Sequence, residues 1–382
     1  MKLGSRLASL VISDIRAMTR ACDQVPDGIN LGQGICDLPT PPPVADGAID
    51  AIRAHRAAYT LPEGIVPLRA AIAGRITARY GSVYDPATEV VVTAGATGGF
   101  AAACLALFDP GDELVLFEPY YGYHMNTVLT MGMVPVRVPT RPPEWHFDPA
   151  AMERVITPRT RGVVVCTPAN PSGKVWSPSE LDALTALCVK HDLLAVTDEI
   201  YEYILYDGCH HVPLATRPGA RERTVTLSGF SKTFSVTGWR LGYLTAPPEL
   251  ARRITIAHDL LYVCAPTPLQ HAMLAGLAMP ESYYTDMAAE YARKRDVLCA
   301  ALRDAGLTPH VPHGAYYVLA DVRALGAQDA KAAAGTLLER TGIAAVPGTS
   351  FYRDAVGETL LRFCFAKELD VVQEAARRLR AM

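Results

Sequence analysis

The chain alternates short, continuous apolar runs with longer stretches in which apolar residues recur every three or four positions. The short runs predict buried strands over 90–93, 114–117, 161–166, 193–197, 224–227 and 242–245. Stretches with helical spacing lie before and between these runs, and they predict helices over 43–56, 67–80, 179–190 and 248–261. Strands separated by helices are typical of an α/β domain with a largely parallel sheet.

The C-terminal part of the chain follows another pattern. One long helix is predicted over 281–305, where Gly306 stops it. Strands over 316–322 and 360–365 then predict a smaller α+β part. We therefore expect an N-terminal arm with part of the small domain over 1–42, a large domain over 43–285 and a C-terminal small domain over 286–382.

The N-terminal segment does not have the layout of a signal peptide. The spacing of Ile12, Ile15 and Met18 instead predicts an amphipathic helix. The longest run without a charged residue, Val90 to Phe108, has the length of a membrane span, but its three glycines divide it into a strand, a turn and a helix. We expect no membrane partner.

The composition limits the classes of partner further. Half of the 382 residues are apolar, and the formal net charge is −3 at pH 7. This nearly balanced charge implies no surface that seeks a polyanion, so we expect no nucleic-acid partner. The nine cysteines are scattered, odd in number and never arranged as C-x-x-C, which indicates reduced thiols in a cytoplasmic protein. None of the ten histidines has the spacing of a metal site, and no metal is expected.

The segment from Ser228 to Gly242 carries the strongest chemical signal. It contains one lysine, Lys232, among small and hydroxylated residues, and Arg240 follows eight positions later. An enclosed lysine loses hydration, which favours the neutral, nucleophilic amine that Schiff-base chemistry needs. The planar fork of an arginine suits an anion such as phosphate. A single S-x-x-K taken alone is more often a loop with an exposed lysine.

Four other stretches place turns, aromatic or polar groups directly after apolar runs. A glycine-rich turn over 94–99 opens a helix, whose free amides and dipole attract anions. Tyr121, Asn170 and Asp198 each follow a predicted strand. A carboxylate in apolar surroundings, as expected for Asp198, is costly unless it meets a cation. Each feature taken alone also has an ordinary structural explanation. These are a tight-packing turn for 94–99, a core aromatic for Tyr121, an N-P-x-G turn for Asn170 and a helix N-cap for Asp198.

These motifs occur in one order over nearly the full chain, and together they resemble a known family. The resemblance is to the pyridoxal-phosphate-dependent aminotransferases of class I and II, with the aspartate aminotransferase fold (fold type I), and it is closest to the kynurenine/glutamine-type and broad aromatic or neutral branches. It implies a large domain with a mixed, mainly parallel seven-stranded sheet flanked by helices, plus a smaller α+β domain. It also implies pyridoxal 5′-phosphate (PLP) as the cofactor and a homodimer with shared active sites.

The resemblance implies roles for the residues that would surround the cofactor ring. Lys232 would hold PLP as an aldimine and carry the proton of the reaction. Asp198 would pair with the protonated pyridine nitrogen, and Tyr121 would stack on the ring. Tyr201 and Asn170 would donate to the phenolic oxygen.

The remaining implied roles concern the phosphate and the substrate. The phosphate contacts implied by the resemblance are the amides of Ala96 and Thr97, the side chains of Ser231 and Arg240, and Tyr59 reaching across the dimer interface. The substrate contacts implied are Gly34, Asn170 and Arg362, with Arg362 holding the α-carboxylate by a bidentate pair.

The sequence departs from the family at two positions. Cys36 stands where many relatives have proline, which affects the path of the glycine- and proline-rich loop around it. Gly229 stands where some relatives place a phosphate-binding serine, and Ser228 or Ser231 would replace it, with Ser231 preferred. The Asn170–Pro171 peptide bond can be cis, since only X-Pro bonds adopt that form cheaply.

The expected activity is a ping-pong transfer of the amino group of an L-amino acid to a 2-oxo acid. A neutral or aromatic donor is expected, because Tyr59, Tyr121, Tyr123 and Tyr262 could line an aromatic pocket, and no second arginine stands out for a side-chain carboxylate. An alternative is another PLP enzyme of the same fold, such as a cysteine-conjugate β-lyase, a cyclase or an oxidase. A non-enzymatic PLP-binding regulator is a third candidate, against which the retention of every matching chemical group counts.

Overall fold

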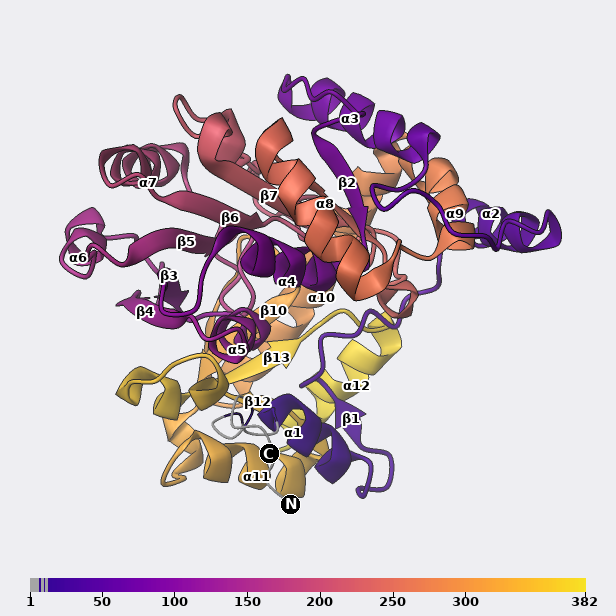
Figure 1. Ribbon diagram of the computed structural model, residues 1–382. Coiled ribbons are helices and arrows are strands. Elements are labelled where there is room, and N and C mark those ends of the chain that lie inside the picture. The colour runs from indigo at the N-terminus through magenta and orange to yellow at the C-terminus, as the bar shows by residue number, and fades with distance from the viewer. Residues whose placement is uncertain (1–6, 8–9, 11–12) are drawn as a thin grey trace, which may run out of the picture.

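The computed structural model describes residues 7, 10 and 13–382 (Figure 1). The predicted N-terminal helix is present as α1 (Asp14–Cys22), which contains Ile15 and Met18, whereas Ile12 lies outside the described residues. It begins where Ser13 accepts a hydrogen bond from the amide of Ile15 at 3.3 Å, a typical N-cap.

A seven-stranded sheet forms the centre of the larger part of the molecule. Its strand order is β2-β8-β7-β6-β5-β3-β4, and all neighbours are parallel except β8, which is antiparallel to both β2 and β7. This mixed, mainly parallel sheet confirms the predicted fold class. Its strands are β2 (Val90–Thr93), β3 (Glu113–Glu118), β4 (Val134–Pro139), β5 (Thr160–Cys166), β6 (Leu194–Asp198), β7 (Thr224–Gly229) and β8 (Gly242–Thr245).

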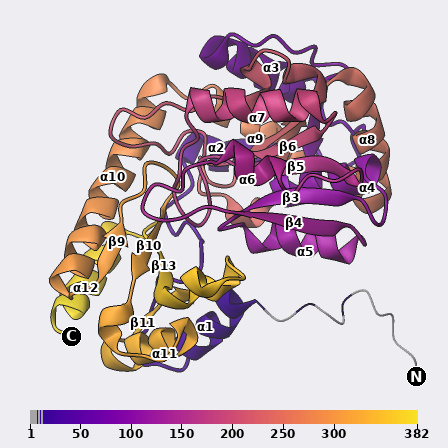
Figure 2. The ribbon, with the colours of Figure 1, turned by 90° about the vertical axis from the view of Figure 1, so that its left-hand side faces the viewer.

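Helices cover both faces of this sheet, which explains why its strands are apolar on every side. In β5, Val164 packs with one face, whereas Val163 and Val165 pack with the other, because successive side chains of a strand point in opposite directions. Figure 2 shows α7 and α5 on opposite sides of the strands. One face carries α4 (Gly95–Leu107), α5 (Gly122–Thr130) and α8 (Pro248–Tyr262). The other carries α3 (Val66–Tyr80), α6 (Pro149–Glu153), α7 (Pro178–Lys190) and α9 (Thr267–Leu277), with α2 (Pro42–Arg53) packed on α9.

A second, antiparallel sheet organises the smaller part. Its strand order is β12-β13-β10-β9, and helices from the C-terminal part cover it. Figure 2 shows the long helix α10 running from beside the large sheet down to the small one. These elements are β9 (Thr308–His310), β10 (Tyr317–Asp321), β12 (Val346–Pro347), β13 (Leu360–Cys364), α10 (Glu281–Asp304), α11 (Ala330–Thr341) and α12 (Leu369–Arg380).

The N-terminal segment joins the smaller part rather than the large sheet. Strand β1 (Ile29–Asn30) pairs in parallel with β11 (Ile343–Ala344), and the buried Cys22 of α1 packs with Leu338 and Ala344. The expected division into parts over 1–42, 43–285 and 286–382 stays a prediction. No helix in residues 13–382 is long and apolar enough to cross a bilayer.

Most predicted elements are confirmed, with small shifts at their ends. The helix predicted over 43–56 is α2, which ends at Arg53, and the cap of α7 is Ser177, which forms a capping box with Glu180. Strand β4 was not predicted, because its sequence contains two prolines and most of its side chains are exposed or half-buried.

Candidate active site

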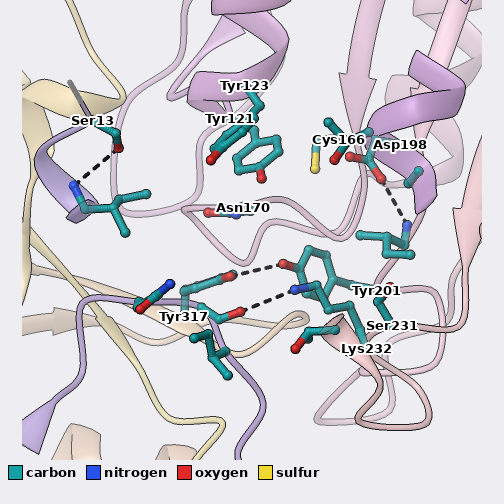
Figure 3. A pocket seen from close by; sticks show the side chains of 18 of the residues that line it. Ser13, Tyr121, Tyr123, Cys166, Asn170, Asp198, Tyr201, Ser231, Lys232 and Tyr317 are labelled. Atoms are coloured by element: carbon teal, nitrogen blue, oxygen red, sulfur yellow. Dashed lines mark hydrogen bonds between the residues drawn. The ribbon is translucent and has the colours of Figure 1, made fainter. Parts of the chain in front are cut away.

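The C-terminal ends of three central strands meet at one edge of the large sheet. Cys166 at the end of β5 is in register with Asp198 at the end of β6, and β7 continues directly into the turn that carries Lys232. A cavity of about 480 Å³ lies at this edge (Figure 3). Parallel α/β sheets bind ligands at this end of their strands.

The cavity gathers almost every residue that the sequence singled out. Its lining includes Gly34, Ala96, Thr97, Tyr121, Asn170, Asp198, Tyr201, Ser231, Lys232, Arg240 and Arg362. Tyr59 and Tyr262 do not line this cavity, and Tyr59 is 82% exposed. Residues as far apart in the sequence as Gly34 and Arg362 therefore line one cavity, as the resemblance implied.

Lys232 points into the cavity from the turn after β7. Its Nζ donates a hydrogen bond to the carbonyl oxygen of Gly34 at 3.3 Å. Burial lowers the pKa of this amine to about 8, more than the nearby thiols of Cys36 and Cys364 raise it. An appreciable fraction of the amine is therefore neutral and nucleophilic near neutral pH.

Asp198 is held by a histidine that the sequence analysis did not single out. His124 Nε2 lies 3.1 Å from Asp198 Oδ2, and the amide of Ile200 donates to Asp198 Oδ1 at 3.3 Å. His124 lies in the first turn of α5, three positions after Tyr121, so both side chains belong to the same strand-to-helix connection. That spacing was the one signal in the sequence that could have revealed it. The buried carboxylate is thus fixed in orientation.

Three tyrosines enclose the side of the cavity near Lys232. Tyr201 Oη lies 3.1 Å from Tyr317 Oη, and Tyr316 donates to the carbonyl oxygen of Gly34 at 3.2 Å. Burial raises the pKa of Tyr201 well above its usual value, so its hydroxyl stays protonated and can donate at neutral pH. Gly34 must be glycine, because a Cβ there would collide with the Tyr317 hydroxyl.

The ring of Tyr121 forms one wall of the cavity. It stacks with Tyr123 at 5.3 Å between ring centroids and meets the ring of His124 edge-on at 5.1 Å. Figure 3 shows the two tyrosine rings side by side above Asn170. Asn170 is buried, and its peptide bond to Pro171 is cis. A flat aromatic face and a fixed amide therefore border the same space.

One end of the cavity is suited to an anion. Ala96 and Thr97 lie in the first turn of α4, which presents free amides and the positive end of the helix dipole. The guanidinium of Arg240 lies beside this turn. Its Nη2 is 2.8 Å from the position that a Cβ on Gly95 would occupy. A Cβ on Gly242 would come within 2.7 Å of the Ala96 nitrogen, so strand β8 also approaches the turn closely.

The two serines near Gly229 differ in where they lie. Ser231 is buried and lines the cavity, whereas Ser228 donates a hydrogen bond to Glu202 at 2.6 Å and does not line it. Gly229 itself leaves no room for a side chain, because a Cβ there would lie 2.9 Å from the Cα of Gly242. Close contact between β7 and β8 thus explains the glycine at this position.

Arg362 is the largest fully buried side chain in the structure, at 1% exposure. Its Nη1 donates to Asn170 Oδ1 at 2.9 Å, and its Nη2 donates to the carbonyl oxygen of Gly32 at 2.6 Å. Its Nε has no hydrogen-bond partner among the described residues, and the centre of the Tyr317 ring lies 4.4 Å from its central carbon. A buried cation with an unused donor is suited to an anionic ligand such as a carboxylate.

These groups fit PLP. The cavity supplies a nucleophilic amine for an aldehyde, a buried carboxylate for a ring nitrogen, an aromatic face for the ring and an anion site for the phosphate. The unpaired donor of Arg362 remains for the carboxylate of an amino acid. The fold and this set of groups together define a PLP-binding protein of fold type I.

Comparison with known proteins identifies the family. Residues 26–379 match the family described as aminotransferase class I and II, and the chain belongs to this family of PLP-dependent enzymes. The sequence is 38% identical to the probable N-succinyldiaminopimelate aminotransferase DapC of Mycobacterium tuberculosis, over 92% of this chain and 91% of that protein. It is 34% identical to kynurenine–oxoglutarate transaminase 3 of Mus musculus, over 92% and 85% of the two chains.

Solved structures agree with this assignment. The N-succinyldiaminopimelate aminotransferase of Mycobacterium tuberculosis superimposes with a TM-score of 0.96 and 36% identity, over 100% of both chains. YbdL of Escherichia coli, whose structure is described together with a methionine aminotransferase function, also gives a TM-score of 0.96, with 31% identity over 100% of both chains.

Proposed function

We propose that this protein transfers the amino group of a neutral or aromatic L-amino acid to a 2-oxo acid by a ping-pong mechanism. The main support is that Lys232, Asp198 and Arg362 line one cavity, where they provide an amine, a carboxylate and a buried cation. The named activities of its relatives, which act on kynurenine, methionine or N-succinyldiaminopimelate, are all amino-group transfers.

The walls of the cavity support a donor with an apolar or aromatic side chain. Tyr121 and Tyr123 form a stacked pair that lines it, whereas Tyr59 and Tyr262 do not line it. The aromatic pocket expected from the sequence is therefore smaller than four tyrosines. A planar or neutral side chain gains contact area against the stacked pair without leaving a charge unpaired.

The cofactor would be held by the residues that the sequence motifs indicated. Lys232 Nζ would bond covalently to its aldehyde carbon, and Asp198, held by His124, would keep the ring nitrogen protonated. The remaining proposed contacts are the ring of Tyr121, the hydroxyl of Tyr201, the amide of Asn170, the amides of Ala96 and Thr97, and the side chains of Ser231 and Arg240. When bound, PLP supplies an electron sink that stabilises negative charge on the substrate Cα.

The chain's own residues would perform the proton transfers. Arg362 and Asn170, already joined by a hydrogen bond, would fix the α-carboxylate and so direct the Cα–H bond toward Lys232. Lys232 would then serve as the base that takes up the Cα proton, since burial lowers the pKa of its amine to about 8, and its protonated form would return the proton as the acid. Gly34 limits the space around this amine through its carbonyl contact at 3.3 Å.

We further propose a homodimer in which Tyr59 reaches the partner's phosphate site. Tyr59 lies in a segment anchored by Thr267, whose hydroxyl donates to the carbonyl oxygen of Ala58 at 2.8 Å. Exposed apolar side chains gather in the neighbouring segments, and such patches are typical of interfaces: Leu61, Val66, Leu260, Leu261 and Val263. The scattered cysteines favour a reducing compartment, which we propose to be the cytoplasm.

A visible absorption spectrum of the protein with PLP tests the activity. We expect a band from the lysine-bound cofactor that bleaches with phenylalanine or glutamine and returns when a 2-oxo acid is added. A strong preference for aspartate would contradict the proposed donor class. Pyruvate and ammonia released from a substrate with a β-leaving group, without any 2-oxo acid, would contradict transamination and indicate a lyase. Absence of any band would contradict PLP binding.

A further inference from the structure

We propose that Arg16 binds the second carboxylate of a dicarboxylic 2-oxo acid, and that this residue sets the specificity for the amino acceptor. The inference rests on the proposed transamination and concerns its second half-reaction. The sequence indicated no arginine for a distal carboxylate, but the structure brings Arg16 of α1 to the wall of the active-site cavity. It lies outside every motif that marks the site.

The distribution of charge in the cavity points to this role. The basic side chains that line it within residues 13–382 are Arg16, Lys232, Arg240 and Arg362. Three of these already have a place in the proposed function. Arg240 lies beside the anion site of α4, and Lys232 is the nucleophile. Arg362 is hydrogen-bonded to Asn170 and would bind the α-carboxylate. Arg16 is exposed, and its side chain forms no ion pair or hydrogen bond with another described residue. It is therefore the cation of this cavity that remains available for a second carboxylate.

The backbone that carries Arg16 is held firmly on both sides. Ser13 caps the helix, and Ser350 donates to the carboxylate of Asp14 at 2.8 Å, with Lys331 at 3.4 Å from the same carboxylate. Ile15 packs against the apolar cluster that includes Phe351 and Trp145. The first turn of α1 is thus attached to the smaller part of the molecule, and its position relative to Arg362 of β13 is fixed by that part.

Arg16 also has space to leave the cavity. It borders a second cavity of about 850 Å³, which shares Ser13, Ile15, Tyr121 and Tyr123 with the first. The charged groups around this second space are Asp14, Asp329, Lys331, Arg353 and Glu358. An arginine at the boundary can turn inward to a dicarboxylic acceptor and outward when an aromatic donor lies against the tyrosine pair. One cavity can then accept two chemically different partners in alternation.

Acceptor kinetics test this role. With phenylalanine as donor, kcat/KM is measured for 2-oxoglutarate and for pyruvate, which share the α-keto acid group and differ in the distal carboxylate. In Arg16→Gln we expect the ratio of the two values to fall about 10- to 100-fold, the size of a charge-assisted arginine–carboxylate interaction. The ratio for Arg16→Lys should lie between those of wild type and Arg16→Gln, because a lysine keeps the charge but loses the bidentate geometry.

Arg20 provides a matched control. It lies one helical turn further along α1, is exposed and lines neither cavity, so Arg20→Gln should leave the ratio unchanged. An unchanged ratio in Arg16→Gln, or an equal fall in both variants, would overturn the proposal.

A binding measurement separates this proposal from the proposed function. Calorimetry on the holoenzyme compares glutarate with pentanoate, two unreactive acids that differ in the second carboxylate. We expect wild type to prefer glutarate and Arg16→Gln to lose about tenfold of that preference. Equal affinity of wild type for both acids would refute the role of Arg16. If wild type prefers glutarate but transfers no amino group, the proposed transamination is contradicted, whereas the carboxylate site at Arg16 is supported.

Discussion

The two ends of the active-site cavity are built in different ways. The proposed cofactor end (Ala96, Thr97, Asp198 and Lys232) consists of residues that end strands of one sheet or follow them within a few positions. The substrate end (Gly34, Arg16 and Arg362) draws on an irregular loop, the first turn of α1 and a strand of the second sheet. If these roles hold, the large sheet positions the cofactor chemistry, whereas recognition of the substrate depends on how the two parts of the chain pack together.

The two ends also differ in how their charges are held. At the cofactor end, Asp198 is buried and has His124 and a backbone amide as partners. At the substrate end, Arg362 is also buried, but its Nε has no partner within residues 13–382, and Arg16 is exposed. A cofactor that stays bound is held best by side chains whose orientation is already fixed. Substrates that bind and leave in turn need hydrogen-bond donors that have no other partner before they bind.

Replacement of Lys232 should have the largest effect and would break the cofactor end. Lys232→Ala removes both the covalent attachment and the proton carrier, so we expect kcat to fall by at least about 10³-fold. The visible band of the lysine-bound cofactor should also disappear, while circular dichroism stays unchanged. Lys190→Ala, at an exposed lysine of α7, serves as the control. Unchanged turnover in Lys232→Ala would rule out the catalytic assignment.

Replacement of Asp198 should have the next largest effect. Asp198→Asn keeps the shape but removes the buried charge, and we expect kcat to fall about 10²- to 10³-fold. His124→Asn should cost less, about tenfold, because it removes one hydrogen bond to the carboxylate but not the charge. Steady-state rates of the two variants give the comparison. If His124→Asn were as damaging as Asp198→Asn, the histidine would have a direct part in the chemistry rather than a positioning one.

The sequence predicted that the residues of the cofactor end would meet, because they belong to contiguous motifs, and they line one cavity. Each apolar strand ends in or leads directly into the group that it positions, as with Asp198 at the end of β6, so neighbours in the sequence are also neighbours in space. His124 was missed because a single histidine on a helix has many ordinary functions, and its spacing of three positions from Tyr121 is a weak signal without the contact to Asp198. The fold class followed from the same alternation of strands and helices.

The substrate end could be predicted only in part. Arg362 was found through its resemblance to a family position, since an arginine on an apolar strand is by itself more often a surface residue. Arg16 and Tyr317 were not found, because neither stands in a motif and their places depend on packing between segments hundreds of residues apart. Strand β4 was missed for a local reason, its two prolines.

A change at Arg362 would sharpen the comparison from the substrate end. Arg362→Lys keeps the charge but loses the fork that reaches Asn170 and Gly32 together, so we expect kcat/KM to fall about 10- to 100-fold for every amino acid. The visible spectrum of the bound cofactor should not change, because Lys232 and Asp198 remain. Parallel titrations with PLP and with phenylalanine measure both effects. Loss of PLP affinity in this variant would mean that the two ends are not separable.

The smallest expected effect concerns the pH at which the protein without cofactor captures PLP. Capture needs the neutral amine of Lys232, and its pKa of about 8 lies below the usual lysine value of 10.5 because burial disfavours the charged form. The rate should therefore rise about tenfold from pH 7 to about pH 9 and then level off, since the amine is already neutral. An ordinary lysine would continue to gain rate beyond pH 10. Stopped-flow absorbance over pH 7–10.5 measures the profile, with Cys36→Ser as a control for the neighbouring thiol. A midpoint near 10.5 would mean that Lys232 is open to water before PLP binds, and the difference between the two ends of the cavity would then arise only in the holoenzyme.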